Sequence, residues 1–133
     1  ELMVVMIIVG VLASLAIPNF IRTKERALDK EAQTALNLIN AAERIYRVKE
    51  NTYFPFGTSA DQAAMNNALQ LDLTSQSWQY GIQLASDTVF IATAVRNVAS
   101  GNPWEREWWF GSASTPSLSC TDGTSTTACP PPW

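Results

Sequence analysis

The side chains that most often do chemistry near neutral pH are scarce in this chain. There is no histidine, so the usual general base and the commonest metal ligand are both missing. Four aspartates are scattered through segments typical of turns, where Asp is favoured for backbone reasons: Asp61, Asp72, Asp87 and Asp122. A nucleophile and its base could be assembled only from chance carboxylates. We therefore predict that the protein is not an enzyme, and we expect no cofactor and no metal.

A lone carboxylate precedes the most unusual stretch of the sequence. Glu1 is followed by an uncharged run to Ile21, and Leu2–Ile17 is apolar on every side. A helix over Leu2–Ile17 would be about 24 Å long. That is a few residues short of the ~20 usually needed to cross a bilayer, which the run to Ile21 just reaches. An all-round apolar helix must be buried in lipid or protein. The rest of the chain is too small and too polar to wrap it, so a membrane or other copies of the chain must provide the burial.

Burying an ionised Glu1 carboxylate beside this apolar run costs free energy, unless the group takes up a proton or pairs with a cation. The nearest cationic side chain is Arg22, roughly 30 Å away along a helix, so the remaining candidate partner is an N-terminal amine. We predict that Glu1 is an assembly residue.

The order Glu1-Leu-Met-Val-Val-Met-Ile-Ile-Val-Gly10, continued to Pro18, resembles the N-terminal segment of type IV pilins and of the related pseudopilins of type II secretion. The resemblance is strong over roughly residues 1–50. In that family a dedicated peptidase removes a short basic leader, and the new N-terminus is methylated. The family's glutamate lies a few residues into the mature chain, whereas this sequence begins at it. We expect that the preceding residues are missing from the printed sequence or were trimmed.

The resemblance implies a structural subunit, the major pilin of a type IV pilus, that polymerises into an extracellular helical filament. Glu1 would then pair with the methylated amine of a neighbouring subunit. The inner membrane before assembly, the pilus assembly machinery and the prepilin peptidase are the other implied partners. Two alternatives stay open: a pseudopilin or minor pilin, and a membrane-anchored binding domain that never polymerises. The net charge of −3 argues against binding to nucleic acid.

The elements that must position this segment begin with a long helix. Neither Gly nor Pro interrupts residues 19–50, so the helix is expected to run from Leu2 to Glu50. Gly10 and Pro18 are its weak points, since Pro costs about 3 kcal/mol and Gly about 1 kcal/mol inside a helix. From the residues alone, the structural interpretation of these two weak points is a simple kink in the helix. The resemblance to assembled pili favours local melting between them in the filament.

The remaining pattern predicts an α+β pilin fold. An apolar stripe follows the second half of the helix: Leu28, Ala32, Ala35, Leu36, Ile39, Ala42 and Tyr46. We expect residues 1–26 to project and residues 27–133 to form the head. The head would hold a connector (51–77) with a short helix capped from Ser59, an antiparallel meander of three to four strands (78–112) and a tail (113–133). The tryptophans on or beside these strands are expected to pack in the core or between subunits.

The tail carries the two cysteines, Cys120 and Cys129. They cannot form an ordinary zinc site without further ligands. Major pseudopilins carry calcium in this region, but Asp122 alone offers too few oxygen ligands. In an exported chain a disulfide that closes the ten-residue loop is the better interpretation.

Overall fold

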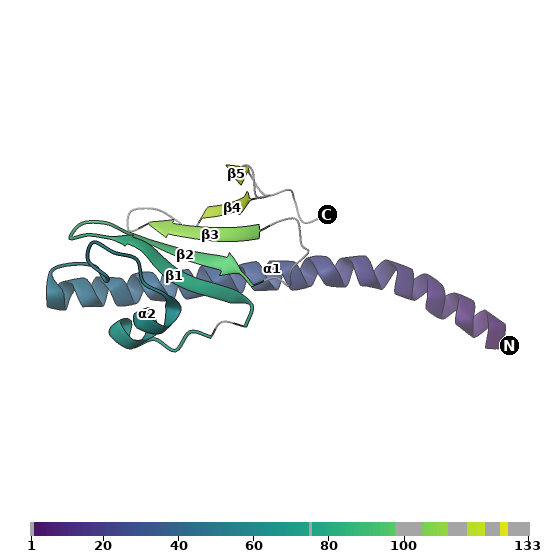
Figure 1. Cartoon of the computed structure of the whole chain (residues 1–133). Helices are drawn as coiled ribbons and strands as arrows, with labels where there is room; N and C mark the ends of the chain where they lie inside the picture. Colours follow the sequence, from purple (N-terminus) through teal and green to yellow (C-terminus); the bar gives the residue numbers. More distant parts are fainter. Residues whose placement is uncertain (1, 75, 98–104, 112–116, 122–125, 128–133) are drawn as a thin grey trace.

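A computed structural model describes residues 2–74, 76–97, 105–111, 117–121 and 126–127. It contains two helices and five strands: α1 (Leu2–Glu50), α2 (Gln62–Leu69), β1 (Trp78–Ala85), β2 (Phe90–Arg96), β3 (Glu105–Gly111), β4 (Ser117–Thr121) and β5 (Thr126–Thr127). The strands form one antiparallel sheet in the order β1-β2-β3-β4-β5. Figure 1 shows this sheet along the C-terminal half of α1, while the N-terminal half extends beyond it. The predicted α+β arrangement is confirmed.

Helix α1 is continuous over 49 residues, which corresponds to about 73 Å. Basic residues in its last turn, Arg47 and Lys49, suit the negative end of the helix dipole. The helix ends where Asn51 takes a left-handed backbone conformation, with φ at 60°. The Asn51 N–H donates to the carbonyl of Arg47 at 2.9 Å. Asn tolerates this conformation better than most residues, so it can terminate the helix and turn the chain back toward the sheet.

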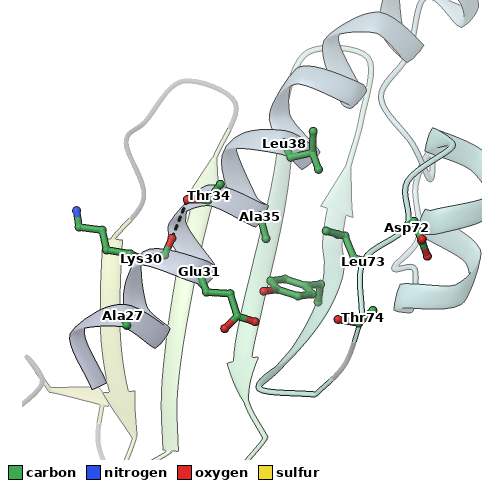
Figure 2. Close-up of a pocket in the computed structure, with 10 residues that line it drawn as sticks. Ala27, Lys30, Glu31, Thr34, Ala35, Leu38, Asp72, Leu73 and Thr74 are labelled. Carbon is green, nitrogen blue, oxygen red and sulfur yellow. Dashed lines mark hydrogen bonds between the residues drawn. The ribbon is translucent and has the colours of Figure 1, made fainter. Parts of the chain in front are cut away.

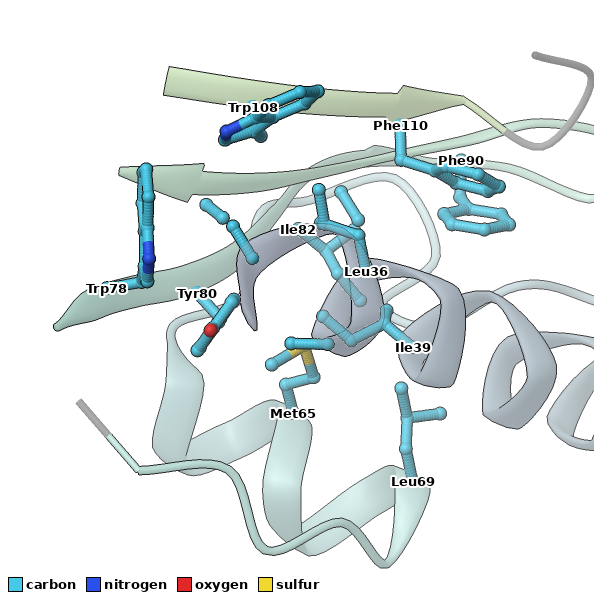
Figure 3. Packing of buried hydrophobic residues seen from close by; sticks show 14 of the residues in the cluster. Leu36, Ile39, Met65, Leu69, Trp78, Tyr80, Ile82, Phe90, Trp108 and Phe110 are labelled. Atoms are coloured by element: carbon cyan, nitrogen blue, oxygen red, sulfur yellow. The ribbon is translucent and has the colours of Figure 1, made fainter. Parts of the chain in front are cut away.

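The core lies between one stripe of α1 and the inner face of the sheet (Figure 3). The helix contributes four buried apolar residues: Ala32, Ala35, Leu36 and Ile39. Alternate residues of the strands cover them: Trp78, Tyr80, Ile82, Phe90, Ala92, Ala94, Trp108 and Phe110. Leu28, Ala42 and Tyr46 are partly buried against the same cluster. The helical stripe and the period-two strands were therefore predicted correctly, and each buries the face that the other leaves uncovered.

Strand β1 departs from strict alternation after Ile82. Its register against β2 shifts between Ile82 and Leu84, so the inward position passes to Ala85. Leu84 is 49 % exposed, whereas Ile82 is 1 % exposed. In the sequence Leu84 continues the period-two alternation of Trp78, Tyr80 and Ile82, which predicts that it shares their buried face. That prediction is wrong, because the irregularity moves the residues that follow it to the opposite face.

Helix α2 begins later than expected. Its N-cap is Asp61, whose carboxylate accepts the N–H of Ala64 at 2.9 Å, so the predicted cap at Ser59 is wrong. Ser59 precedes Ala60, which is engaged in a bridge with Ile82 of β1 and is therefore extended. The buried side of α2 is Met65 and Leu69, whereas the expected Ala63 and Ala64 are exposed.

The sheet is larger than predicted, with five strands in place of three to four. Segments 117–121 and 126–127 of the tail add β4 and β5 to the edge of β3. Segment 117–121 alternates only over Leu118 and Cys120, and segment 126–127 has no apolar residue, so this pattern is too short to predict strands. The edge of β3 offers unpaired backbone N–H and C=O groups, and hydrogen bonding to such an edge does not depend on side-chain pattern.

Candidate assembly surface

The N-terminal part of α1 is an apolar surface that nothing in its own chain covers. Every residue from Leu2 to Ser14 is exposed, from 85 % at Leu2 to 53 % at Ile8 among the large apolar side chains. No Asp, Glu, Lys or Arg lies among them. Contiguous exposed apolar surface on this scale marks a site of interaction with protein or lipid. Within the described residues, no helix is long and apolar enough to cross a membrane.

This segment has little polar structure of its own. The Ser14 hydroxyl donates to the carbonyl of Val11 at 2.7 Å, so the hydroxyl is satisfied within the helix. A Cβ added at Gly10 would meet nothing within 4 Å. Gly10 and Pro18 both lie within the continuous helix of this single chain. The predicted melting concerns the filament and stays a prediction.

Three side chains of the sheet hold α1 at the place where it leaves the head. The Trp78 indole N–H donates to the carbonyl of Leu28 at 2.9 Å. The Trp108 indole N–H donates to the Asp29 carboxylate at 3.4 Å. The guanidinium of Arg96 lies 3.5 Å from the Glu25 carboxylate, with both side chains largely buried.

These three contacts come from β1, β2 and β3 and reach two successive turns of the helix. The guanidinium of Arg96 also lies 5.3 Å from the centre of the Trp78 ring, a cation–π distance that links two of them. The direction in which the projecting half of α1 leaves the head is therefore fixed by side-chain hydrogen bonds and charge as well as by the apolar core.

A second polar contact fixes the opposite end of the head. Glu43 is fully buried, and its Oε2 accepts the N–H of Phe54 at 3.0 Å. Burial raises the pKa of this carboxyl to about 7, and the Phe54 hydrogen bond offsets only part of that rise. The contact attaches the start of the connector to α1. The connector is further held to the β1–β2 turn by the N–H of Tyr53, which donates to the carbonyl of Ser86 at 3.0 Å.

The described part of the head is hollowed by several grooves. One groove of about 480 Å³ lies between α1, β1 and residues 72–74 of the connector (Figure 2). Its ionisable side chains are Lys30, Glu31, Asp72 and Tyr80. Burial raises the pKa of the Tyr80 hydroxyl to about 12, with a smaller contribution from the negative charge of Glu31, so this phenol is a poor acid. Among the described residues, no three His, Cys, Asp or Glu side chains gather as they would around a metal ion.

The predicted site residues are not gathered at one place. Gly10 and Pro18 lie in the projecting helix, and Cys120 lies in β4, where its backbone pairs with Arg106 and Thr127. Glu1 and Cys129 lie outside the described residues. Two pairings therefore stay predictions: that of Glu1 with the N-terminal amine of a neighbouring subunit, and the disulfide between Cys120 and Cys129.

Sequence reasoning missed the residues that hold the head together by polar contacts. Glu43 continues the stripe of Leu36 and Ile39 at spacings of three and four. A carboxylate at such a position in an apolar stripe is a sequence signal that could have predicted its burial. Arg96 alternates with the buried Phe90, Ala92 and Ala94 along β2, so it is the charged end of the inward face. The two tryptophans were expected in the core, but their N–H partners could not be derived without the packing.

Comparison with known proteins provides the remaining evidence. A type IV major pilin, PilA of Myxococcus xanthus, is 39 % identical over 56 residues, which cover 42 % of this chain and 26 % of that protein. Two type II secretion system core proteins G are similar. The one from Pectobacterium carotovorum is 40 % identical over 53 residues, covering 40 % of this chain and 34 % of its own. The one from Aeromonas hydrophila is 38 % identical over 53 residues, covering 40 % of this chain and 37 % of its own.

These relatives confirm the predicted resemblance to the type IV pilin superfamily. The chain spans about a quarter to just over a third of the length of the relatives it matches. No family model matches the chain, and no solved structure matches it significantly. The relatives do not separate a pilus subunit from a secretion pseudopilin.

Proposed function

We propose that this protein is the major subunit of a type IV pilus and that it polymerises into a helical filament through the projecting half of α1. The observation that carries the proposal is the apolar, uncharged and exposed segment Leu2–Ser14 on a helix whose second half is fixed to a folded head. The relative from M. xanthus bears the name of a major pilin. None of the three relatives is named as an enzyme, and we propose no catalytic role for this chain.

Burial of the projecting helix supplies the driving force for association. With about 100–150 Å² of apolar surface on each large side chain and about 25 cal/mol per Å², the gross gain is tens of kcal/mol. Much of that gain would only exchange lipid for protein if the subunit waits in the inner membrane, as the resemblance implies. Close packing and the pairing of Glu1 would then select the correct neighbour.

We further propose that the molecule divides near residue 26 into a filament segment (1–26) and a head (27–133). Leu28 is the first apolar residue of α1 that packs against the head, and the Glu25–Arg96 ion pair lies just before it. The peptidase that removes a leader and the assembly machinery enter this proposal only through the resemblance, as do N-terminal methylation and the final position on the cell surface.

The competing function is that of a pseudopilin in type II secretion, favoured by the two core proteins G among the relatives. Electron microscopy of material sheared from cells that carry the gene, with antibody against the head, separates the two. Long surface filaments labelled along their length are expected for a major pilin. Absence of surface filaments, together with a secretion defect when the gene is deleted, would favour the pseudopilin. A chain that stays monomeric in membranes would contradict both functions.

A further inference from the structure

Glu43 is the only charged residue among the fully buried side chains that the structure describes. It lies on α1 within the stripe that packs on the sheet, between Ile39 and Tyr46. One carboxylate oxygen, Oε2, accepts the N–H of Phe54 at 3.0 Å. The other, Oε1, is buried and has no hydrogen-bond partner among the described residues. An ionised carboxylate in that position would lack both water and a counter-charge, which costs several kcal/mol.

The charged and titratable groups around it are engaged elsewhere. On α1, the Arg47 guanidinium donates to the Tyr53 hydroxyl at 3.2 Å and lies 5.0 Å from the centre of that ring. Arg44 donates to Asn40 and is exposed. The connector contributes Tyr53, and the adjoining β1–β2 turn contributes Asp87, which is exposed.

Apolar groups make up the rest of the surroundings. Tyr46 and Phe54 lie edge to face, with ring centres 5.7 Å apart. Phe90 of β2 lies against Tyr53, and Phe110 of β3 lies against Phe90. The buried residues of α2, Met65 and Leu69, are also apolar. No cation in the described residues neutralises Glu43.

We infer that Glu43 is a pH-sensitive latch that holds the start of the connector against α1 when its carboxyl is neutral and loosens it when the carboxyl ionises. When the carboxyl is neutral, its Oε2 continues to accept the hydrogen bond from the Phe54 N–H, and no charge is buried in the core. In the ionised form Oε1 requires water, and we expect residues 53–57 of the connector, which carry the Phe54 N–H, to move away from α1 to admit it. That stretch is otherwise tied by Tyr53 to Ser86 and by the Gly57 N–H to the carbonyl of Ala85 at 2.9 Å.

The direction of the effect follows from proton binding. The folded state raises the pKa of this carboxyl from its ordinary value of 4.5 to about 7. Between these values the folded head binds more protons than the unfolded chain, so stability is greatest in mild acid and declines as pH rises toward 7. Above about pH 7 the decline ends. Acidic surroundings therefore close the latch and neutral to alkaline surroundings loosen it.

The test uses the full chain in a zwitterionic detergent, with Glu43→Gln as the neutral variant and Glu50→Gln as the matched control. Glu50 is an exposed carboxylate at the end of the same helix. Carbon-13 NMR of the wild-type carboxyls is expected to show Glu43 titrating near pH 7. Between pH 5 and pH 8 the folding equilibrium constant of the wild type and of E50Q should fall about tenfold or more, while that of E43Q should change much less.

Amide hydrogen exchange reports on the latch itself. Protection factors of Phe54 and Gly57 should decrease between pH 6 and pH 8 in the wild type and stay constant in E43Q, while Ala60, bonded to Ile82, stays protected in both. Titration of Glu43 near pH 4.5, or unchanged Phe54 protection after it ionises, would overturn the inference. The second result would mean that Arg47 or local water neutralises the carboxylate without opening the connector. The NMR titration needs no variant, so a Gln substitution that fails to fold leaves the test intact.

Discussion

At the scale of single residues, the difference between Ile82 and Leu84 shows how far one irregularity can redirect a strand. Both are apolar residues at alternate positions, and the sequence treats them alike. The register shift between them places Ile82 in the core and leaves Leu84 half exposed. A shift of one position exchanges the two faces of a strand, so the core depends on the location of the irregularity.

The matched variants Ile82→Ala and Leu84→Ala test this placement. Ile82→Ala removes a fully buried side chain and should destabilise the head by about 2–5 kcal/mol. Leu84→Ala should cost about 1 kcal/mol or less, because its side chain is already half in water. Urea unfolding of the full chain in detergent, followed by tryptophan fluorescence, measures both free energies of unfolding. Equal costs would contradict the observed register.

Single residues also show which features of the fold could be predicted from the sequence and which could not. The stripe on α1 is periodic, so the sequence is enough to place Leu36 and Ile39 against the sheet, whereas the alternation in β2 gives two faces without saying which one is inward. The irregularity after Ile82 and the N-cap at Asp61 depend on contacts with distant segments. The Ala60 bridge to Ile82 is one of them. No local pattern contains that information.

At the scale of elements, the tail is the part that the sequence described least well. Strands β4 and β5 pair with the edge of the sheet through their backbones, and their sequences hold few apolar residues. A two-residue strand at the edge of a sheet contributes little by itself. An additional covalent link would explain how such a short strand keeps its place.

We predict that Cys120 and Cys129 form that link. The register sets Thr127 opposite Cys120, and Cys129 follows Thr127 by two residues in the sequence. On the chain-entropy model, a ten-residue loop closed in this way stabilises by somewhat less than about 3 kcal/mol. Intact-mass analysis after alkylation, with and without prior reduction, measures the state of the thiols. Two alkylated cysteines in unreduced native protein would contradict the pairing.

The projecting half of α1 raises a second question at this scale, because its isolated and assembled states need not be alike. In the single chain the helix runs through Gly10 and Pro18 without a break, and Figure 1 shows it curving toward the N-terminus. Pro18 lacks the N–H that would bond the carbonyl of Ser14, and Gly10 adds its own helix penalty. Both costs lie within the segment that, on the proposed function, would change its surroundings when the subunit enters a filament.

We predict that in the filament the backbone between Gly10 and Pro18 is at least partly non-helical, while residues 19–50 remain helical. A map of the filament by cryo-electron microscopy measures this directly. Gly10→Ala combined with Pro18→Ala should restore helix there. A wild-type map that shows an unbroken helix with only a bend at Pro18 would favour the simple kink.

At the scale of the whole molecule, the chain consists of a head, whose apolar residues bury one another in a core, and a projecting helix, whose apolar residues are exposed. The two halves share one continuous element, so any force on the projecting helix reaches the head through Leu28, Asp29 and Glu25. Those contacts come from three strands. A subunit built in this way can pass load along a filament without relying on the apolar core alone.

The last prediction concerns the residue that begins the uncharged run. Glu1 precedes an apolar surface that a membrane or neighbouring subunits must cover, and in either place its carboxylate would lie far from water. It must then take up a proton or pair with a cation. Arg22 is about 30 Å away along the helix, beyond the reach of any side chain. An N-terminal amine of a neighbouring subunit remains, and its pairing with Glu1 would set the axial register as each subunit is added.

Glu1→Ala should therefore leave the fold of the head unchanged, because the described core is built from residues 32–110, and should sharply reduce assembly. The yield of sheared filaments per cell, compared with the amount of subunit in the membrane fraction, measures this effect. Glu50→Ala, which removes an exposed carboxylate from the same helix, is the control and should assemble normally. The expected loss is large because an unpaired buried charge, or a lost pairing, recurs at every subunit of the filament. Normal filament yield from Glu1→Ala would show that packing of the apolar helix alone sets the register.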